Sequence, residues 1–238
     1  MRRIFAPVLA AGLLFSAAFA AHAEDTLNPP HWQSQGTFGS YDIAAVQRGF
    51  LVYQSVCASC HAAGALHYRD LEALGFSPDQ AAGIAASVKL ANGSPATLDD
   101  TFKAPSVSAA AFGGALPPDL STIESARPHG LRYIYNLLTG YAAAPASVTL
   151  LPGRFYNTAY PGPQIAMPQP LKGGEVTYAD GTAATLPQEA SDVSAFLAWS
   201  ADPNLSARHE IGLRAVLFLA FLSIIAIAAK RKIWRETA

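Results

Sequence analysis

Apolar side chains recur at every third or fourth position in four stretches of the chain, and this spacing predicts amphipathic helices. The first stretch places Val46, Phe50 and Tyr53 on one face and ends just before residue 57. The other three stretches are residues 71–90, 128–140 and 190–200. Gly- and Pro-rich segments separate the four stretches, so the pattern predicts a mainly α fold with long Gly/Pro loops.

Two local signals refine this pattern. Within residues 71–90, Gly75 and Ser77-Pro78 interrupt the helical spacing, because glycine and proline weaken or end a helix. Farther along, residues 175–182 (EVTYADGT) contain the pair Asp180-Gly181, which favours a tight turn. We therefore expect a small β-hairpin in this segment.

The first 23 residues have the three-part pattern of a secretory signal peptide. Arg2 and Arg3 precede an apolar run, and Ala21-His22-Ala23 forms an A-x-A cleavage site. The sequence therefore predicts an exported protein whose main domain comprises residues 24–210. The alternative is an uncleaved membrane helix at the N-terminus.

A second apolar run, residues 211–229, contains a single charge, on Arg214. As a helix it would be about 28 Å long at ~1.5 Å per residue, close to the hydrocarbon thickness of a bilayer. Basic side chains cluster in the tail, residues 230–238, which the positive-inside rule places in the cytoplasm. We predict one transmembrane helix that holds residues 24–210 on the periplasmic face of a bacterial inner membrane; a buried core helix is the alternative.

Composition narrows the class of protein further. Of the 238 residues, 51% are hydrophobic and 14% are charged, with a formal net charge of −1, which excludes a disordered chain and a general nucleic-acid binder. This small sum hides a division, because residues 24–210 carry sixteen acidic and nine basic side chains. Such an acidic domain would attract a basic partner at long range, or would simply keep the domain soluble.

The only two cysteines of the chain lie in the pentapeptide Cys57-Ala-Ser-Cys60-His61. CxxCH is the attachment motif of c-type haem, in which both thiols bond to the porphyrin and the histidine ligates the iron. Because the predicted protein is exported and has no other cysteine, we expect one covalently attached haem c.

Two other uses of a CxxC pair are possible. A thioredoxin-like redox pair would require a βαβ context, which this Ala-, Pro- and Gly-rich chain lacks. A structural zinc site would require two further Cys or His ligands at matching spacing.

The second axial position of the iron separates an electron carrier, which fills it, from a peroxidase, which leaves it open. The candidate ligands are Met167, His31, His67, His129 and His209. Met167 is the only methionine besides the initiator, and it lies in the Pro-rich stretch 160–170, where a stiff loop can hold a thioether. We favour Met167 as the ligand; the alternative is that it fills a gap in the core.

Four motifs follow one another along the chain: RGFLVYQSVCASCH, GALPPDLS at 114–121, YIYNLLTGY at 133–141 and IAMPQPL at 165–171. The segment DVSAFLAWSADP then precedes the apolar run. In order and spacing these motifs resemble the cytochrome c1 family, over roughly residues 30 to 235. Cytochrome c1 is the haem subunit of the cytochrome bc1 complex.

The resemblance implies a cytochrome c-type haem domain followed by one C-terminal transmembrane helix. Cys57 and Cys60 match the positions that hold the haem. His61 and Met167 match the two axial ligands of its iron.

Four further residues match the family's cofactor-binding positions. Pro117 and Pro118 would pack against the haem edge. Arg127 and Tyr133 match positions that contact a haem propionate, and a guanidinium is well suited to pair with a carboxylate.

The resemblance also implies a function: an electron-transfer subunit of quinol:cytochrome c oxidoreductase without acid–base catalytic residues of its own. Its partners would be cytochrome b, on which the C-terminal helix docks, a Rieske iron–sulfur protein that donates electrons, and a cytochrome c that accepts them, within a dimeric complex. The alternatives are a membrane-anchored periplasmic carrier outside a bc1 complex and a haem peroxidase.

Overall fold

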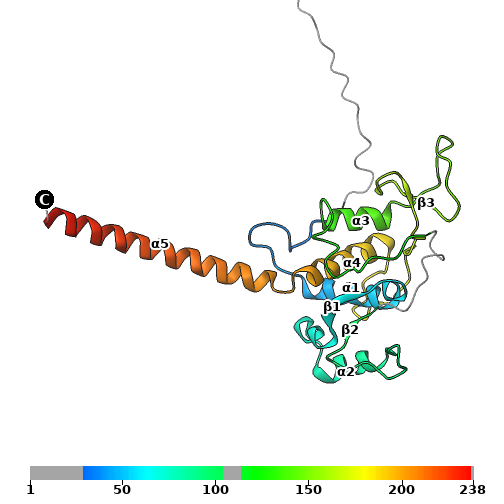
Figure 1. The fold of residues 1–238 in the computed structure, drawn as a ribbon, viewed down its shortest axis with the longest axis horizontal. Coiled ribbons are helices and arrows are strands. Elements are labelled where there is room, and N and C mark those ends of the chain that lie inside the picture. Colours follow the sequence, from blue (N-terminus) through cyan, green and yellow to red (C-terminus); the bar gives the residue numbers. More distant parts are fainter. Residues whose placement is uncertain (1–28, 104–113, 237–238) are drawn as a thin grey trace, which may run out of the picture.

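The computed structural model describes residues 29–103 and 114–236, which form a helical domain with one long helix projecting from it (Figure 1). The predicted signal peptide lies outside the described residues. The helices are α1 (Ile43–Ser55), α2 (Pro78–Ala86), α3 (Leu131–Thr139), α4 (Leu186–Ala201) and α5 (Leu205–Glu236), with the short 3-10 helices η1 (Cys57–Ser59) and η2 (Tyr68–Leu74). The predicted mainly α fold is confirmed.

Strands contribute little to the described part of the chain. β1 (Ala63–His67) pairs antiparallel with β2 (Thr101–Phe102), with Ala63 opposite Phe102 and an irregularity before His67. β3 (Phe155–Tyr156) pairs antiparallel with β4 (Gln164–Ile165). These two small sheets fasten loops and form no layer of their own.

Side-chain caps explain where the helices begin. The Asp42 carboxylate accepts hydrogen bonds from the N–H groups of Ala44 and Ala45 at the start of α1. Ser77 and Gln80 form a capping box at the start of α2. Because Gly75 ends η2 in the left-handed conformation (φ 89°), the stretch 71–90 is interrupted where the sequence predicts it.

The core lies between α1 and α4, which form the most extensive contact between two elements of the domain. Gly49 of α1 lies so close to the backbone of Asp192 on α4 that a Cβ at this position would overlap the Asp192 carbonyl. Beside this contact, Tyr53 of α1 packs on Phe196 of α4 with ring centroids 5.2 Å apart.

An ion pair also joins α1 to α4. Arg48 binds both carboxylate oxygens of Asp192, at 2.9 and 3.1 Å, and Asp192 is only 1% exposed. The same guanidinium reaches Asp180 at 2.9 Å, and Gln188 donates to Asp192 at 3.0 Å. Hydrogen bonding to Asp192 raises the pKa of Arg48, so the guanidinium stays charged.

The predicted β-hairpin at residues 175–182 is wrong, although its turn forms. The Gly181 N–H donates to the Tyr178 carbonyl at 3.2 Å, and Gly181 has a φ of 78°. The N–H groups of Glu175 and Val176 donate to the Glu189 carboxylate on α4, at 2.9 and 3.2 Å, instead of to a second strand. A contact that is distant in sequence therefore replaces the local pairing.

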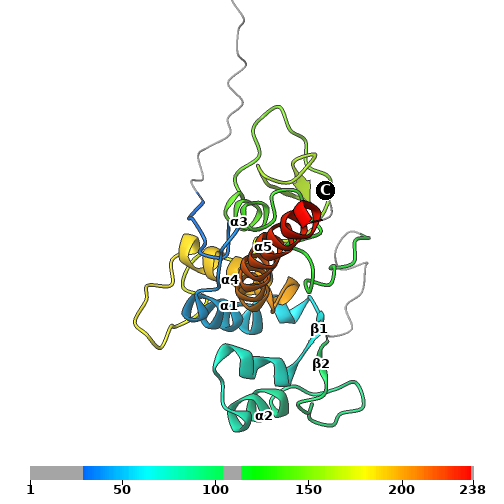
Figure 2. The same cartoon turned by 90° about the vertical axis from the view of Figure 1, so that its left-hand side faces the viewer.

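Helix α5 projects from the domain, as the two perpendicular views show (Figures 1 and 2). It contains the whole predicted span 211–229, begins six residues earlier and continues into the tail. Its most apolar window has a mean hydropathy of 2.5 and none of it is buried, which is the property of a candidate membrane span. The alternative of a buried core helix is therefore wrong.

Glu189 should make the stability of the domain depend on pH. This carboxyl is fully buried, and its Oε2 has no hydrogen-bond partner. Burial, together with the neighbouring Glu175 carboxylate, raises the pKa of Glu189 to about 7. The folded state therefore retains a proton that the unfolded state releases near its ordinary pKa of about 4.3, so stability is lost as the pH rises from about 5 to 7.

We expect Glu189→Gln to flatten this pH dependence and to increase the free energy of unfolding at pH 8 by about 2 kcal/mol, with a smaller gain at pH 5. The pKa of Glu175 is lowered, so this carboxyl makes the folded state less stable only as the pH falls below its ordinary pKa. That effect lies below the range of pH 5 to 8. Urea denaturation from pH 5 to 8 measures the effect, with the exposed Glu72→Gln as control. Parallel curves for Glu189→Gln and the unsubstituted protein would contradict the prediction.

Candidate functional site

The CxxCH motif follows α1 with one residue between them, and a tight turn folds it back on itself. The N–H groups of Cys60 and His61 both donate to the Cys57 carbonyl, at 3.0 and 2.8 Å. This turn brings the two cysteines and the histidine together. Both thiols are half-buried and free, so no disulfide joins them.

The chemistry of Cys57 argues against a thioredoxin-like thiol pair. Cys57 packs against the hydrophobic core. Burial raises the pKa of its thiol to about 12, whereas a redox-active thiol needs a lowered pKa. Within residues 29–103 and 114–236, no group of three or more His, Cys, Asp or Glu side chains is arranged to hold a metal ion.

His61 is oriented by a residue 57 positions away. Its Nδ1 lies 2.7 Å from the carbonyl oxygen of Pro118. Because a carbonyl can only accept, Nδ1 carries the hydrogen and Nε2 keeps the lone pair that a metal requires. A metal-ligating histidine characteristically donates its other ring nitrogen in this way. Two free thiols beside an imidazole in this tautomer fit a covalently attached haem.

The segment that contains Pro117 and Pro118 is fixed by Asp119. The Asp119 carboxylate accepts from the N–H groups of Gly64 and Ser121, at 2.9 and 2.8 Å. Partial burial acts to raise the pKa of Asp119, but these hydrogen bonds outweigh it and the pKa is lowered. Asp119 is therefore ionised at neutral pH and holds the Pro118 carbonyl in place.

Arg127 and Tyr133, two of the predicted site residues, lie close together. The Arg127 guanidinium carbon lies 6.0 Å from the centre of the Tyr133 ring, within reach of a cation–π contact. Arg127 is exposed just before α3, and Tyr133 is half-buried on its first turn. Burial raises the pKa of Tyr133, so its hydroxyl remains a hydrogen-bond donor.

Met167 is half-buried in an irregular segment that follows β4. Its carbonyl accepts a hydrogen bond from the Tyr141 hydroxyl at 3.0 Å. The hydrogen bonds and ion pairs of the described residues do not join Met167 directly to the CxxCH motif. Both parts nevertheless attach to α4, because α1 and α3 pack against the same helix.

Asn157 anchors the start of the loop that leads to Met167. It is fully buried, and its amide donates to the Leu137 carbonyl of α3 at 2.8 Å. Its Oδ1 accepts from the N–H groups of Ala159 and Tyr160, at 3.0 and 3.1 Å. The sequence analysis missed this residue, although an Asn before a Pro- and Gly-rich stretch is a recognisable turn signal.

Of the four histidines that are alternative ligands, two make polar contacts and two are exposed. His209 Nδ1 is 2.7 Å from the Gly39 carbonyl, and His67 precedes η2 beside Asp70. His31 and His129 are exposed, and His129 has a φ of 66° in the turn before α3. His209 and His67 therefore have other partners, and Met167 stays the predicted ligand.

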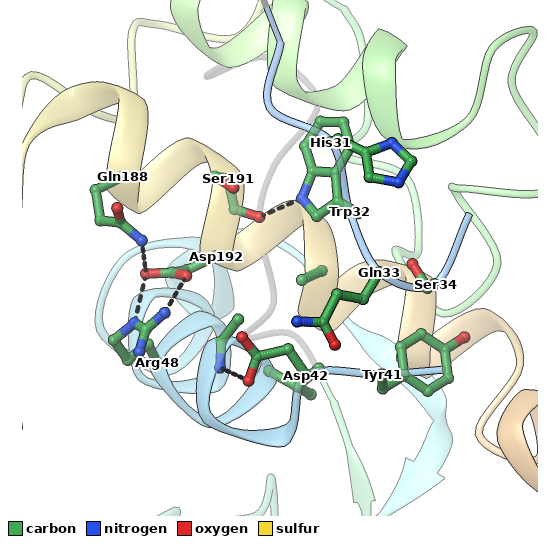
Figure 3. Close-up of a pocket in the computed structure, with 13 residues that line it drawn as sticks. His31, Trp32, Gln33, Ser34, Tyr41, Asp42, Arg48, Gln188, Ser191 and Asp192 are labelled. Atoms are coloured by element: carbon green, nitrogen blue, oxygen red, sulfur yellow. Dashed lines mark hydrogen bonds and ion pairs between the residues drawn. The ribbon is translucent and has the colours of Figure 1, made fainter. Parts of the chain in front are cut away.

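A cavity of about 200 Å³ lies between the segment 31–42, α1 and α4 (Figure 3). Its wall includes the Arg48–Asp192 ion pair and Trp32, whose indole N–H donates to the Ser191 carbonyl at 3.1 Å. The cavity includes none of the eight residues predicted to bind the haem; of the alternative ligands, His31 lines it. Its polar wall joins the N-terminal segment to the helices and does not supply the chemistry of the CxxCH motif.

A helix that leads into a CxxCH turn, a histidine held by a proline carbonyl and a mainly helical domain together define a c-type cytochrome. The apolar helix α5 adds a candidate membrane anchor to that domain.

Comparison with known proteins specifies the family. The model of the Cytochrome C1 family matches residues 32–237. The chain is 40% identical to cytochrome c1 of Rhodospirillum rubrum, covering 96% of both chains. It is 38% identical to the mitochondrial cytochrome c1 1 heme protein of Arabidopsis thaliana (92% of this chain, 76% of the relative). It is also 38% identical to the mitochondrial cytochrome b-c1 complex catalytic subunit of Candida albicans (89% and 79%). The chain belongs to the cytochrome c1 family.

Asn157 should be important for the conformation of the Met167 segment. We expect Asn157→Ala to lower the free energy of unfolding by about 2–3 kcal/mol, because it leaves buried backbone groups without partners. Amide hydrogen exchange at Ala159 and Tyr160 should accelerate as well. Asn92→Ala, which removes a similar turn contact at an exposed position, should change stability by less than about 0.5 kcal/mol. Equal losses of stability in the two variants would contradict the role assigned to Asn157.

Proposed function

We propose that this chain is the haem-bearing electron-transfer subunit of a respiratory cytochrome bc1 complex. The observation that carries the proposal is the pair of free thiols beside a histidine whose Nδ1 is bound by Pro118. Membership of the cytochrome c1 family supports it, as does the name of the Candida relative, a cytochrome b-c1 complex catalytic subunit.

Four side chains would hold the cofactor. We propose that Cys57 and Cys60 form thioether bonds to one haem c, and that His61 Nε2 and Met167 Sδ ligate its iron. When bound there, the haem would supply a one-electron iron couple, whose potential a thioether ligand would raise.

Four further residues would complete the pocket. We propose that the Arg127 guanidinium and the Tyr133 hydroxyl bind a propionate, since a guanidinium pairs strongly with a carboxylate. Pro117 and Pro118 would exclude water at the edge of the cofactor. Their rigid backbone suits a surface that must not rearrange.

In this proposal the protein fixes the positions of the groups that would ligate the iron. The Pro118 carbonyl keeps His61 in one tautomer, and Asp119 fixes that carbonyl. Tyr141 and Asn157 fix the segment that contains Met167. Electron transfer requires no proton donor or acceptor from this chain, so the proposed site contains no acid–base catalytic residue.

The arrangement in the membrane follows from the two ends of the chain. We propose that residues 1–23 are removed after export, that residues 24–210 lie in the periplasm, and that residues 211–229 cross a bacterial inner membrane. Residues 230–238 would then be cytoplasmic, in accordance with their basic side chains. The exposed apolar surface of α5 would dock on cytochrome b in a dimeric complex.

The redox partners follow from the same proposal. A Rieske iron–sulfur protein would donate electrons, and a cytochrome c would accept them. The excess of acidic side chains in residues 24–210 would attract a basic acceptor, and this attraction would weaken as salt screens it.

Purification from gently solubilised membranes tests the proposal. We expect the tagged chain to elute with cytochrome b and a Rieske protein and to support antimycin-sensitive quinol:cytochrome c reductase activity that falls with ionic strength. A haem-bearing chain without these subunits would instead indicate an anchored carrier outside a bc1 complex. A chain without covalent haem would overturn the proposal.

The role of Met167 can be tested by substitution. We expect Met167→Leu to open the sixth position, so that carbon monoxide binds the reduced protein, and to lower the reduction potential by on the order of 0.1 V or more. His31→Leu, at an exposed position, should alter neither property. Rapid binding of carbon monoxide to the unsubstituted protein would contradict the ligand assignment and favour a peroxidase.

A further inference from the structure

Phe38 is the most exposed large apolar side chain of the domain that precedes α5, among the described residues, at 72% exposure. It lies in a turn between Trp32 and α1 whose backbone is well fixed. The Gly39 N–H donates to the Gly36 carbonyl at 3.2 Å, and the Ser40 N–H donates to the Gln33 carbonyl at 3.0 Å. The fold therefore presents an aromatic ring to the outside from an ordered turn.

The same turn is fastened to the start of α5. His209 Nδ1 lies 2.7 Å from the Gly39 carbonyl, and the Tyr41 N–H donates to the Ser206 hydroxyl at 3.3 Å. The Tyr41 hydroxyl also binds the carbonyls of Ala198 and Asp202, at the junction of α4 and α5. In both views of the fold the segment before α1 lies beside the first turns of α5 (Figures 1 and 2).

These contacts set the level of Phe38 along α5. His209 precedes Ile211, the first residue of the apolar run, by two positions, or ~3 Å of helix rise. Ile211 is 64% exposed, and the large apolar side chains that follow it along α5 are exposed as well. Phe38 adjoins Gly39 and therefore lies at the level of the helix at which the apolar surface of α5 begins.

This level corresponds to the interfacial layer of a bilayer if α5 spans the membrane. Trp and Tyr are enriched in that layer, and Phe is among the apolar residues with which interfacial segments insert at the boundary between headgroups and acyl chains. Charged groups occur at the same level: Arg208 pairs with Asp202 at 2.9 Å, and Arg214 pairs with Glu210. An exposed ring at the level of paired charges is suited to a lipid headgroup region.

We propose that Phe38 inserts into the interfacial layer of the lipid bilayer and gives the domain a second membrane contact beside α5. This inference rests on the proposed anchoring of the chain by α5. One helix alone would let α5 and the domain fastened to it tilt together relative to the bilayer. A second contact, attached to α5 through Gly39 and Tyr41, restricts that tilt.

Spin labelling of the membrane-embedded complex tests the inference. Because Cys57 and Cys60 are consumed by haem attachment, a single introduced cysteine can carry a nitroxide. The variants are Phe38→Cys, Leu151→Cys as a similarly exposed control (63%) remote from α5, and Ile224→Cys as a mid-helix reference (67% exposed). Each haem-bearing complex is placed in nanodiscs of phosphatidylcholine and phosphatidylglycerol, and collisions with oxygen and with a water-soluble nickel chelate are compared.

We expect the oxygen-to-nickel collision ratio at position 38 to be several-fold higher than at position 151 and lower than at position 224. Equal ratios at positions 38 and 151 would place Phe38 in water and overturn the inference. Exclusion of both reagents at position 38 would also overturn it, because another protein subunit would then cover the ring. A water-like ratio at position 224 would refute the proposed anchoring itself, so the two failures are distinguishable.

Discussion

The close contact between α1 and α4 is the constraint on which the rest of the domain depends. At Gly49 the two helix backbones meet without an intervening side chain, and the neighbouring Arg48 pairs with the buried Asp192. Removing one member of such a pair leaves an uncompensated charge, at a loss of roughly 3–5 kcal/mol. This contact fixes the axis of α1, and therefore the direction in which the CxxCH turn leaves it.

Both halves of the proposed cofactor site are arranged around α4. On one side α1 carries the CxxCH turn, and Ser200 of α4 donates to the Ser121 carbonyl in the segment that follows Pro118. On the other side α3 packs on α4 and, through Asn157, holds the loop that leads to Met167. Hydrogen bonds from side chains to the backbone fix these long loops, which explains how a domain with so few strands presents an ordered surface.

Local sequence predicted the elements, and distant contacts decided the exceptions. The helical spacing in 128–140 and 190–200 identified α3 and α4, but α4 begins earlier, at Leu186, because the Thr185 side chain caps it. The hairpin at 175–182 failed because Glu189 captures its backbone N–H groups. In the site, the CxxCH motif is local and was recognised at once. The bond from His61 to Pro118 joins residues 57 positions apart, and no periodicity could reveal it.

The short connection between α4 and α5 has a consequence for encounters with other proteins. Only residues 202–204 separate the two helices, and the Tyr41 hydroxyl ties the end of α4 to Asp202. The CxxCH turn is joined to α4 through α1, so a series of packed elements fixes its position relative to α5. With α5 in the membrane as proposed, the same series fixes the height of the turn above the bilayer. A protein that diffuses along the membrane surface would then meet this turn at a constant height, so its search for the site would be two-dimensional.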